Sequence, residues 1–335
     1  CSKYYVVECK SGNTWYKGDM FMCSGRPTGA GAHPSTILQT FRLPEPVKGE
    51  LELRFRPTGK EKADTAATES AVPQMIMPKN HLAEYVQYLG NAVPKDTLNV
   101  LCVGNSFTYY WGCPAMLKEI AWNEGHYLRV KSTLKGGQTF GDHLALPVSR
   151  NVVNAGRYDY AFLQDQSQSP ARYASDTTQF DYVNTNFLKL TDRLLSRSRN
   201  CRVILESTWS FEKDDFGGFG SHAAFDSLMT IGTSMMVRNA SKIFGANDFE
   251  VSPIGRAFSI VRNENPGIDL YSADSKHQSD YGSYLKACVN YLMIFRKPFQ
   301  SQPADGATSS IDCSIPHDQA VYLRQVAERV VLGAR

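Results

Sequence analysis

The sequence predicts an α/β protein in which a parallel sheet with crossover helices is preceded by a small β-rich module. From residue 96 onward, short apolar runs of strand length alternate with segments of helical periodicity. Parallel strands joined by helices require this order. Before residue 96, short β-like runs are separated by turn sequences, a pattern typical of a sandwich-like domain. We therefore expect an accessory domain at residues 1–95 and a main α/β domain at residues 96–335.

The composition is that of an ordinary globular protein. The 335 residues are 42% hydrophobic and carry a formal net charge of +3, so a sizeable core can be buried. No basic stripe with interleaved aromatic residues occurs, so nucleic acid is not an expected partner. No apolar run approaches the length of about 18 residues that a membrane-spanning helix needs, so no transmembrane segment is predicted.

The accessory domain is predicted from four β-like runs, at residues 4–7, 15–16, 37–41 and 50–55. The last run alternates apolar and polar residues, as a half-buried strand does. Residues 60–70 are polar and predict an exposed loop. Residues 81–86 fit either another strand or a short helix, and a linker is expected at residues 93–95.

The chain begins with Cys1 followed by serine, which resembles the mature end of a bacterial lipoprotein. We therefore expect an exported protein, periplasmic or on the cell surface, with Cys1 as a candidate site of a lipid anchor. A truncation that begins at a cysteine would give the same sequence.

The eight cysteines include no C-x-x-C pair, so neither a zinc site nor a redox motif is predicted. Three cysteines lie in predicted core elements and are expected to be buried thiols: Cys102, Cys201 and Cys288. Three others lie in more polar surroundings and could form disulfides, with a connectivity that stays open: Cys9, Cys23 and Cys313. His126 and His143 lack metal-ligand spacing, and no phosphate-binding or dinucleotide fingerprint occurs, so neither a metal nor a cofactor is predicted.

The main domain is predicted to hold five strands, at residues 99–103, 127–134, 158–163, 201–205 and 249–251. Helical periodicity is found at residues 114–120, 180–198, 231–237, 253–261, 281–295 and 319–332. The candidate site residues follow predicted strand ends, which is where open α/β sheets bind their ligands.

The first of these strands stops at Gly104-Asn105-Ser106. Ser106 is therefore expected at the carboxyl end of a strand, where nearby backbone N–H groups can hold an anion. A serine in this position is a candidate nucleophile. It is also a candidate helix N-cap, which is the commoner use of serine at a strand–helix turn.

A second motif, Asp274-x-x-His277, follows late in the chain and is succeeded by a family-like tail through residues 282–285. Together with Gly-Asn-Ser, this pattern resembles the SGNH (GDSL-type) hydrolases over four short blocks of residues 98–290. The bacterial subgroup with Gly-Asn-Ser-Phe, common in gut Bacteroidetes, is the most similar. The resemblance implies a three-layer, flavodoxin-like parallel sheet and a serine esterase without a cofactor.

By this resemblance, Ser106 is the nucleophile, His277 accepts its proton, and Asp274 orients the imidazole. Asp and His only three apart are too close in sequence to be triad partners across an extended strand, but they can face the same side on a turn or on the first turn of a helix. Considered singly, His277 fits a solvated surface histidine and Asp274 fits the N-cap of the following helix.

Two further blocks resemble the parts of the family that form the oxyanion hole. In residues 135–139, the Gly137 N–H would act beside the Ser106 N–H, unless Gly137 is only a turn residue. The third block departs from the family, because Leu163-Gln164-Asp165-Gln166 replaces Gly-x-Asn-Asp. Gln166 holds the position of the family asparagine by spacing, and Gln164, nearer the strand end, competes with it. Either glutamine could instead satisfy backbone groups of the loop.

Two weaker candidates border the predicted substrate cleft. Asn105 flanks the nucleophile and, like Thr108, is expected to brace the turn rather than react. Trp209 and the loop of residues 214–222 are candidates for one wall of the cleft, although aromatic residues in loops often only pack.

The resemblance therefore implies a metal-independent serine esterase that removes acyl groups, with acetyl expected, from a carbohydrate, and the expected partner is a small-molecule or glycan ester. A lipase or lysophospholipase is a second interpretation, but the sequence offers no apolar lid or amphipathic surface helix for it. A catalytically silent glycan-binding protein with the same fold is a third, and it is prompted by the altered third block.

Overall fold

The structure is a computed structural model of the chain, and it describes residues 3–23, 53–58, 96–214, 217–245, 249–301, 303 and 315–333. The predictions for residues 37–41, 60–70, 81–86 and 93–95 lie outside the described residues, as do those for Cys1 and Cys313. The boundary between two domains at residue 95 stays a prediction.

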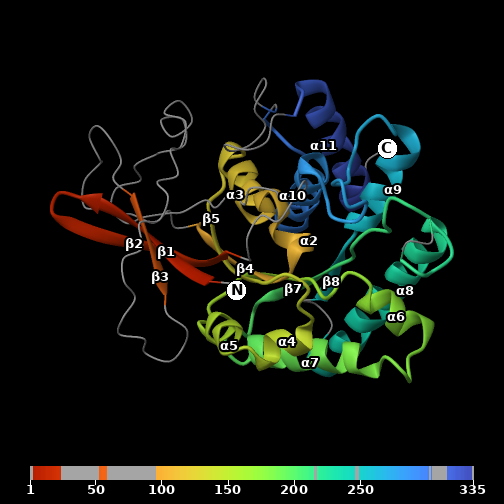
Figure 1. Cartoon of the computed structure of the whole chain (residues 1–335), viewed down its shortest axis with the longest axis horizontal. Coiled ribbons are helices and arrows are strands. Elements are labelled where there is room, and N and C mark those ends of the chain that lie inside the picture. The colour runs from red at the N-terminus through yellow and green to blue at the C-terminus, as the bar shows by residue number, and fades with distance from the viewer. Residues whose placement is uncertain are drawn as a thin grey trace.

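A five-stranded parallel sheet forms the centre of the main domain (Figure 1). Its strands in spatial order are β5 (Leu128–Leu134), β4 (Leu98–Gly104), β6 (Tyr160–Leu163), β7 (Arg202–Glu206) and β8 (Phe249–Ser252). Every neighbouring pair is parallel. The predicted fold class is confirmed, and all five predicted strands are found. The chain reverses its direction of winding between β4 and β6, and such a switch point is where ligands bind in open sheets.

Helices cover both faces of the sheet (Figure 1). Val100 and Cys102 of β4 join the apolar cluster that includes α3 (Cys113–Asn123), α9 (Ile254–Glu264), α10 (Asp280–Phe295) and α11 (His317–Leu332). The alternate residues Leu101 and Val103 join the cluster that includes α4 (Phe140–Ala145), α5 (Pro147–Asn154), α7 (Asp181–Leu195) and part of α8 (His222–Phe244). A strand buried on both faces reads as a continuous apolar run, which explains why β4 was predictable.

Short helices account for the main differences from the sequence prediction. The helices α4, α5 and α6 (Ser169–Ser175) were not predicted, and α8 extends back to His222. The four-residue helix α2 (Ser106–Tyr109) and the 3-10 turn Tyr110–Gly112 precede α3. Helices this short carry little periodicity. The available signals were the capping box of Thr139 and Asp142 at α4 and a proline in the first turn of α5 and of α6 (Pro147 and Pro170).

The described part of the accessory region is an antiparallel sheet of three strands in the order β2-β1-β3. These are β1 (Lys3–Ser11), β2 (Thr14–Cys23) and β3 (Leu53–Thr58), and they lie beyond the β5 edge of the parallel sheet (Figure 1). The predicted runs at residues 4–7 and 15–16 fall in β1 and β2, and residues 53–55 of the run at 50–55 fall in β3, while residues 50–52 lie outside the described residues. None of the described helices is long and apolar enough to cross a membrane.

Cysteine burial agrees with the sequence prediction for Cys102, Cys201 and Cys288. Cys9 differs, because its thiol is buried at 1% exposure in the N-terminal sheet rather than set in polar surroundings. Burial raises the pKa of Cys9, and it also raises the pKa of Cys113 to about 12. These thiols therefore stay protonated at neutral pH.

Helix α8 approaches α6 so closely that Gly232 has no room for a side chain. A Cβ at this position would lie 1.9 Å from the carbonyl oxygen of Pro170. We expect Gly232→Ala to lower the free energy of unfolding by about 1–3 kcal/mol through overpacking. Glycine-to-alanine changes inside helices otherwise raise it by about 0.5–1 kcal/mol. Urea unfolding measures whether Gly232→Ala lowers or raises the free energy of unfolding.

The exposed Ser227 of the same helix provides the control, because Ser227→Ala meets no packed neighbour and should shift stability by no more than about 0.5 kcal/mol. A Gly232→Ala protein as stable as the unsubstituted chain would mean that α6 can move away freely.

Candidate active site

Ser106 lies at the start of α2, immediately beyond β4. The helix is capped by Asn105, whose backbone is extended (φ −132°, ψ −150°) and whose side-chain oxygen accepts from the Phe107 N–H. Ser106 is therefore the first helical residue and not the cap. Since the capping role belongs to Asn105, the serine hydroxyl is left for another purpose.

The structure brings Ser106, His277 and Asp274 together, although 171 positions separate the first two in the chain. The His277 Nε2 lies 2.7 Å from the Ser106 Oγ. The His277 Nδ1 contacts the Asp274 carboxylate, whose other oxygen accepts from the N–H groups of His277 (2.9 Å) and Lys276 (3.2 Å). The three side chains form one hydrogen-bonded chain from carboxylate to hydroxyl.

The spacing of three residues between Asp274 and His277 works because the chain turns between them. Ser275 adopts φ +61°, and its N–H donates to the Ser272 carbonyl while the Ser272 N–H donates to the His277 carbonyl. This closed turn points both side chains in one direction. It lies directly before α10, whose N-cap is Ser279.

The electrostatics of the turn keep Asp274 ionised. Partial burial opposes ionisation, but hydrogen bonds from the His277 side chain and from the N–H groups of His277 and Lys276 outweigh it and lower the pKa of Asp274. An ionised Asp274 accepts the Nδ1 proton of His277, so the neutral imidazole presents Nε2 as an acceptor to the Ser106 hydroxyl.

Aromatic rings hold the imidazole on both sides. Tyr110 stacks on His277 with ring centroids 4.2 Å apart, and Phe107 contacts it at 5.0 Å. Trp209 stacks on Phe107 in turn, and its indole N–H donates to the Lys276 carbonyl. Trp209 is fully buried, so the prediction that it lines the substrate cleft is wrong. It packs beneath the turn that carries His277.

In the described part of the chain, the backbone N–H groups of Ser106 and Gly137 donate to no protein acceptor, and the N–H of the adjacent Gly136 does not either. Gly137 is exposed and has φ +71°, a conformation that glycine adopts without strain. The adjacent Gln138 carbonyl accepts from the Asn105 side chain at 3.0 Å, which fastens this loop to the Ser106 turn. Asn105 is buried and therefore braces the turn rather than lining the cleft.

The two glutamines of the third block differ in their surroundings. Gln164 is fully buried. Its side-chain oxygen accepts from the Asn105 N–H at 3.0 Å and from the Thr108 hydroxyl at 2.9 Å. Its side-chain nitrogen donates to the Asp165 carbonyl. It therefore does not fit the oxyanion role. Gln166 is partly exposed, and its amide nitrogen makes only a long contact of 3.4 Å to the Ser167 hydroxyl.

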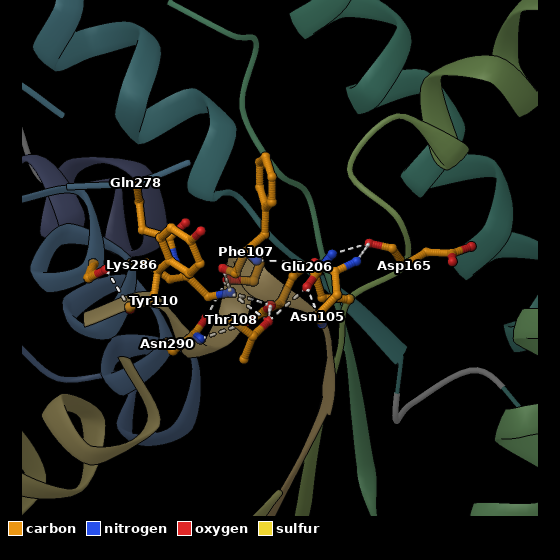
Figure 2. Close-up of polar contacts among 12 residues, drawn as sticks. Asn105, Phe107, Thr108, Tyr110, Asp165, Glu206, Gln278, Lys286 and Asn290 are labelled. Atoms are coloured by element: carbon orange, nitrogen blue, oxygen red, sulfur yellow. Dashed lines mark hydrogen bonds and ion pairs between the residues drawn. The ribbon is translucent and has the colours of Figure 1, made fainter. Parts of the chain in front are cut away.

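A buried polar cluster beneath the Ser106 turn was not predicted (Figure 2). Lys286 of α10 and Glu206 at the end of β7 form an ion pair at 2.7 Å, and Thr108 and Asn290 bond to it. The available signals were a lone lysine inside the apolar run of a helix and a glutamate directly after a buried strand.

No metal is predicted at His143 of α4. In the structure, this side chain braces the other side of the Ser106 turn. Its Nε2 donates to the Gly104 carbonyl at 2.9 Å, and its Nδ1 accepts from the Ser149 hydroxyl. Burial lowers the pKa of His143 to about 4, although its bond to Gly104 opposes the shift. In the described part of the chain, no group of three or more His, Cys, Asp or Glu side chains could hold a metal ion.

Asp165 links the second and third blocks. One carboxylate oxygen accepts from the N–H groups of Phe140 (2.9 Å) and Gln166 (2.8 Å), and its carbonyl accepts from the Asn105 side chain (3.4 Å). Burial raises the pKa of Asp165 to about 7, although the two N–H donors oppose this. The carboxyl therefore titrates near neutral pH.

The fold is the three-layer α/β fold with a parallel sheet that the resemblance to the SGNH hydrolases implies. A DUF4886 family protein from Bacteroides uniformis is similar over 71% of this chain and 95% of its own, with 18% identity and a TM-score of 0.53.

Two other solved structures are more distant. An acetyl xylan esterase from Geobacillus stearothermophilus matches 61% of this chain and 97% of its own at 15% identity, with a TM-score of 0.45. A lipase/acylhydrolase from Enterococcus faecalis matches 61% and 100% at 14% identity, with a TM-score of 0.43. No protein-family model matches the sequence, and no curated protein does.

The raised pKa of Asp165 makes stability depend on pH in a definite direction. The folded-state pKa of about 7 exceeds the value of about 3.9 expected in an unfolded chain. The folded state therefore binds this proton more tightly. The contribution of Asp165 to stability is fully present below about pH 3.9 and is lost as the pH rises through about 7.

Asp165→Asn keeps an oxygen for the N–H groups of Phe140 and Gln166 but cannot ionise. We expect its Tm, relative to the unsubstituted protein, to rise steadily from about pH 5 to about pH 8. Thermal unfolding across this range measures the difference. Asp192→Asn, on the exposed face of α7, controls for the loss of one negative charge. A difference that is independent of pH would show that Asp165 does not titrate there.

Proposed function

We propose that this protein is a serine ester hydrolase that removes acyl groups, with acetyl expected, from a carbohydrate. The observation that carries the proposal is the hydrogen-bonded chain from Asp274 through His277 to the Ser106 Oγ, at the switch point of a parallel sheet. The open N–H groups of Ser106 and Gly137 support it, because ester hydrolysis needs donors for a developing oxyanion.

The first half of the reaction forms an acyl-enzyme. The Ser106 Oγ attacks the ester carbonyl carbon while the His277 Nε2 takes the hydroxyl proton. The carbonyl oxygen becomes an anion, which the N–H groups of Ser106 and Gly137 would hold. The tetrahedral adduct then breaks its bond to the alcohol, which leaves with the proton from His277. Asp274 stabilises the imidazolium between these two steps.

The second half releases the acid. Water attacks the acyl carbon and gives a proton to the His277 Nε2, and the same N–H groups hold the second oxyanion. Collapse of this adduct returns the proton to the Ser106 Oγ and frees the carboxylic acid. The bonds formed and broken balance to ester plus water giving alcohol plus acid, with no cofactor in any step.

The acetyl group and the carbohydrate rest on the resemblance to the bacterial SGNH subgroup. Export and a lipid on Cys1 stay predictions, and an exported enzyme would meet glycan esters outside the cytoplasm.

Removal of the nucleophile is the direct test of this proposal. Ser106→Ala should reduce the hydrolysis of p-nitrophenyl acetate to the rate without enzyme, since triad serines supply most of the rate acceleration. Ser175→Ala, an exposed serine of α6, should leave kcat unchanged. If both variants behave like the unsubstituted protein, the nucleophile assignment is wrong. Failure of the unsubstituted chain to react with a fluorophosphonate would favour a glycan-binding role instead.

Gln166 is the proposed side-chain donor of the oxyanion hole. Gln166→Ala should lower kcat by about 10²–10³-fold with KM changed much less, as the loss of one such donor typically does. Gln179→Ala, at an exposed position, provides the control. If Gln166→Ala keeps full activity, Gln166 is not an oxyanion donor. Its role would then be the hydrogen bond of 2.9 Å in which its side-chain oxygen accepts from the Gln168 N–H.

A further inference from the structure

The buried ion pair of Lys286 and Glu206 lies directly beneath the turn that carries Ser106 (Figure 2). Lys286 is fully buried and Glu206 is 2% exposed. Removing two such charges from water is costly, and their attraction compensates for the cost only when further hydrogen bonds satisfy both groups. A pair of this kind is weak evidence for stability, so its position calls for another explanation.

Every hydrogen of the Lys286 ammonium has an acceptor within bonding distance. The Nζ lies 2.7 Å from a Glu206 oxygen, 2.8 Å from the Phe107 carbonyl oxygen and 3.1 Å from the Thr108 hydroxyl oxygen. The second Glu206 oxygen accepts from the Asn290 amide at 2.7 Å. Completely satisfied buried networks are rigid and fix one arrangement of the groups they hold.

Two of the three acceptors belong to the residues that follow Ser106. Phe107 and Thr108 lie in α2, a helix of four residues, which is too short to be stable on its own. The carbonyls of so short a helix lack the usual intrahelical partners. Lys286 therefore supplies an external donor to the backbone one residue beyond the nucleophile.

The network continues to the residue before Ser106. The Thr108 hydroxyl donates to Gln164 at 2.9 Å, and the same Gln164 oxygen accepts from the Asn105 N–H. The same buried cluster therefore binds the backbone on both sides of Ser106, at the Asn105 N–H and at the Phe107 carbonyl. A shift of about 1 Å in a reacting group can cost about 100-fold in rate, so this restraint bears directly on the geometry at Ser106.

We propose that Lys286, with Glu206 as its counter-ion, is a positioning residue that holds the Ser106 turn in its reactive geometry. The ammonium fixes the Phe107 carbonyl, which keeps the Ser106 Oγ against His277 and leaves the Ser106 N–H turned to the substrate. The inference rests on the proposed esterase function and adds a residue that touches neither substrate nor triad.

Three substitutions separate positioning from mere stability. Lys286→Met removes the donor but leaves Glu206 buried without its counter-ion, so both Tm and kcat should fall. Glu206→Gln keeps an oxygen for Asn290 and removes the charge. The combined variant K286M/E206Q restores neutrality, and its Tm should recover toward that of the unsubstituted protein, since buried pairs are replaceable by neutral groups.

Activity should not recover with stability in the combined variant. Because the Phe107 carbonyl still lacks its donor, we expect kcat for p-nitrophenyl acetate to stay about 10- to 100-fold low, with KM within a few-fold. The rate of fluorophosphonate labelling, in which the Ser106 Oγ bonds to phosphorus and fluoride leaves, should fall in parallel. Both assays use the full chain below its Tm.

Arg324 provides the matched control. It is 5% exposed, donates to the Tyr284 hydroxyl and the Ser301 carbonyl, and lies 3.6 Å from Glu124, away from the Ser106 turn. Arg324→Met should lower Tm as Lys286→Met does but leave kcat unchanged.

The outcomes are distinguishable. If K286M/E206Q regains kcat together with Tm, or if Arg324→Met lowers kcat equally, Lys286 is structural and the inference is overturned. If the unsubstituted protein neither hydrolyses the ester nor is labelled, the proposed function fails and the inference fails with it. Loss of kcat that persists in the stable combined variant supports the positioning role.

Discussion

The turn from β4 into α2 places Ser106 where buried backbone groups must all find partners. Side chains from three other parts of the fold provide them: His143 of α4, Gln164 at the end of β6, and Lys286 of α10. Because these supports come from both helical layers and from the neighbouring strand, the turn keeps its shape only when the whole domain is folded. The Ser106 N–H is the exception within the described residues, and an unpaired donor at such a position suits a ligand oxygen.

His277 is held by a different kind of contact. An aromatic stack runs from Phe258 through Trp209 to Phe107, whose ring also contacts His277. Rings packed in this way limit rotation of the imidazole, and the Trp209 N–H fastens the backbone of its turn. A polar network thus supports Ser106, and an apolar stack supports His277. Phe107 belongs to both, since its carbonyl contacts Lys286 and its ring contacts the imidazole.

The features that the sequence predicted are those encoded locally. β4, β6 and β7 appear as contiguous apolar runs, and the Gly104-Asn105-Ser106 and Asp274-x-x-His277 motifs have short, fixed spacings. Trp209 was misassigned because an aromatic residue after a strand has the same local pattern whether it packs inward or lines a cleft. The partners of Lys286 lie 80 and 179 positions away in the chain, and no local pattern encodes contacts at such distances.

The different burial of its two glutamines explains the altered third block, because Gln164 is fully buried and Gln166 is partly exposed. The side-chain amide of Gln164 is bonded to Asn105, Thr108 and Asp165, so it is not available to a substrate. A side-chain donor in this block must therefore come from farther along the loop, where Gln166 stands. Asp165 connects that loop to the first N–H of α4 through one carboxylate oxygen. Its carbonyl accepts from Asn105, so one residue ties the loops of the proposed oxyanion hole to the Ser106 turn. The departure from the family pattern thus preserves a connected site, in which an internal brace and a candidate donor occupy separate positions.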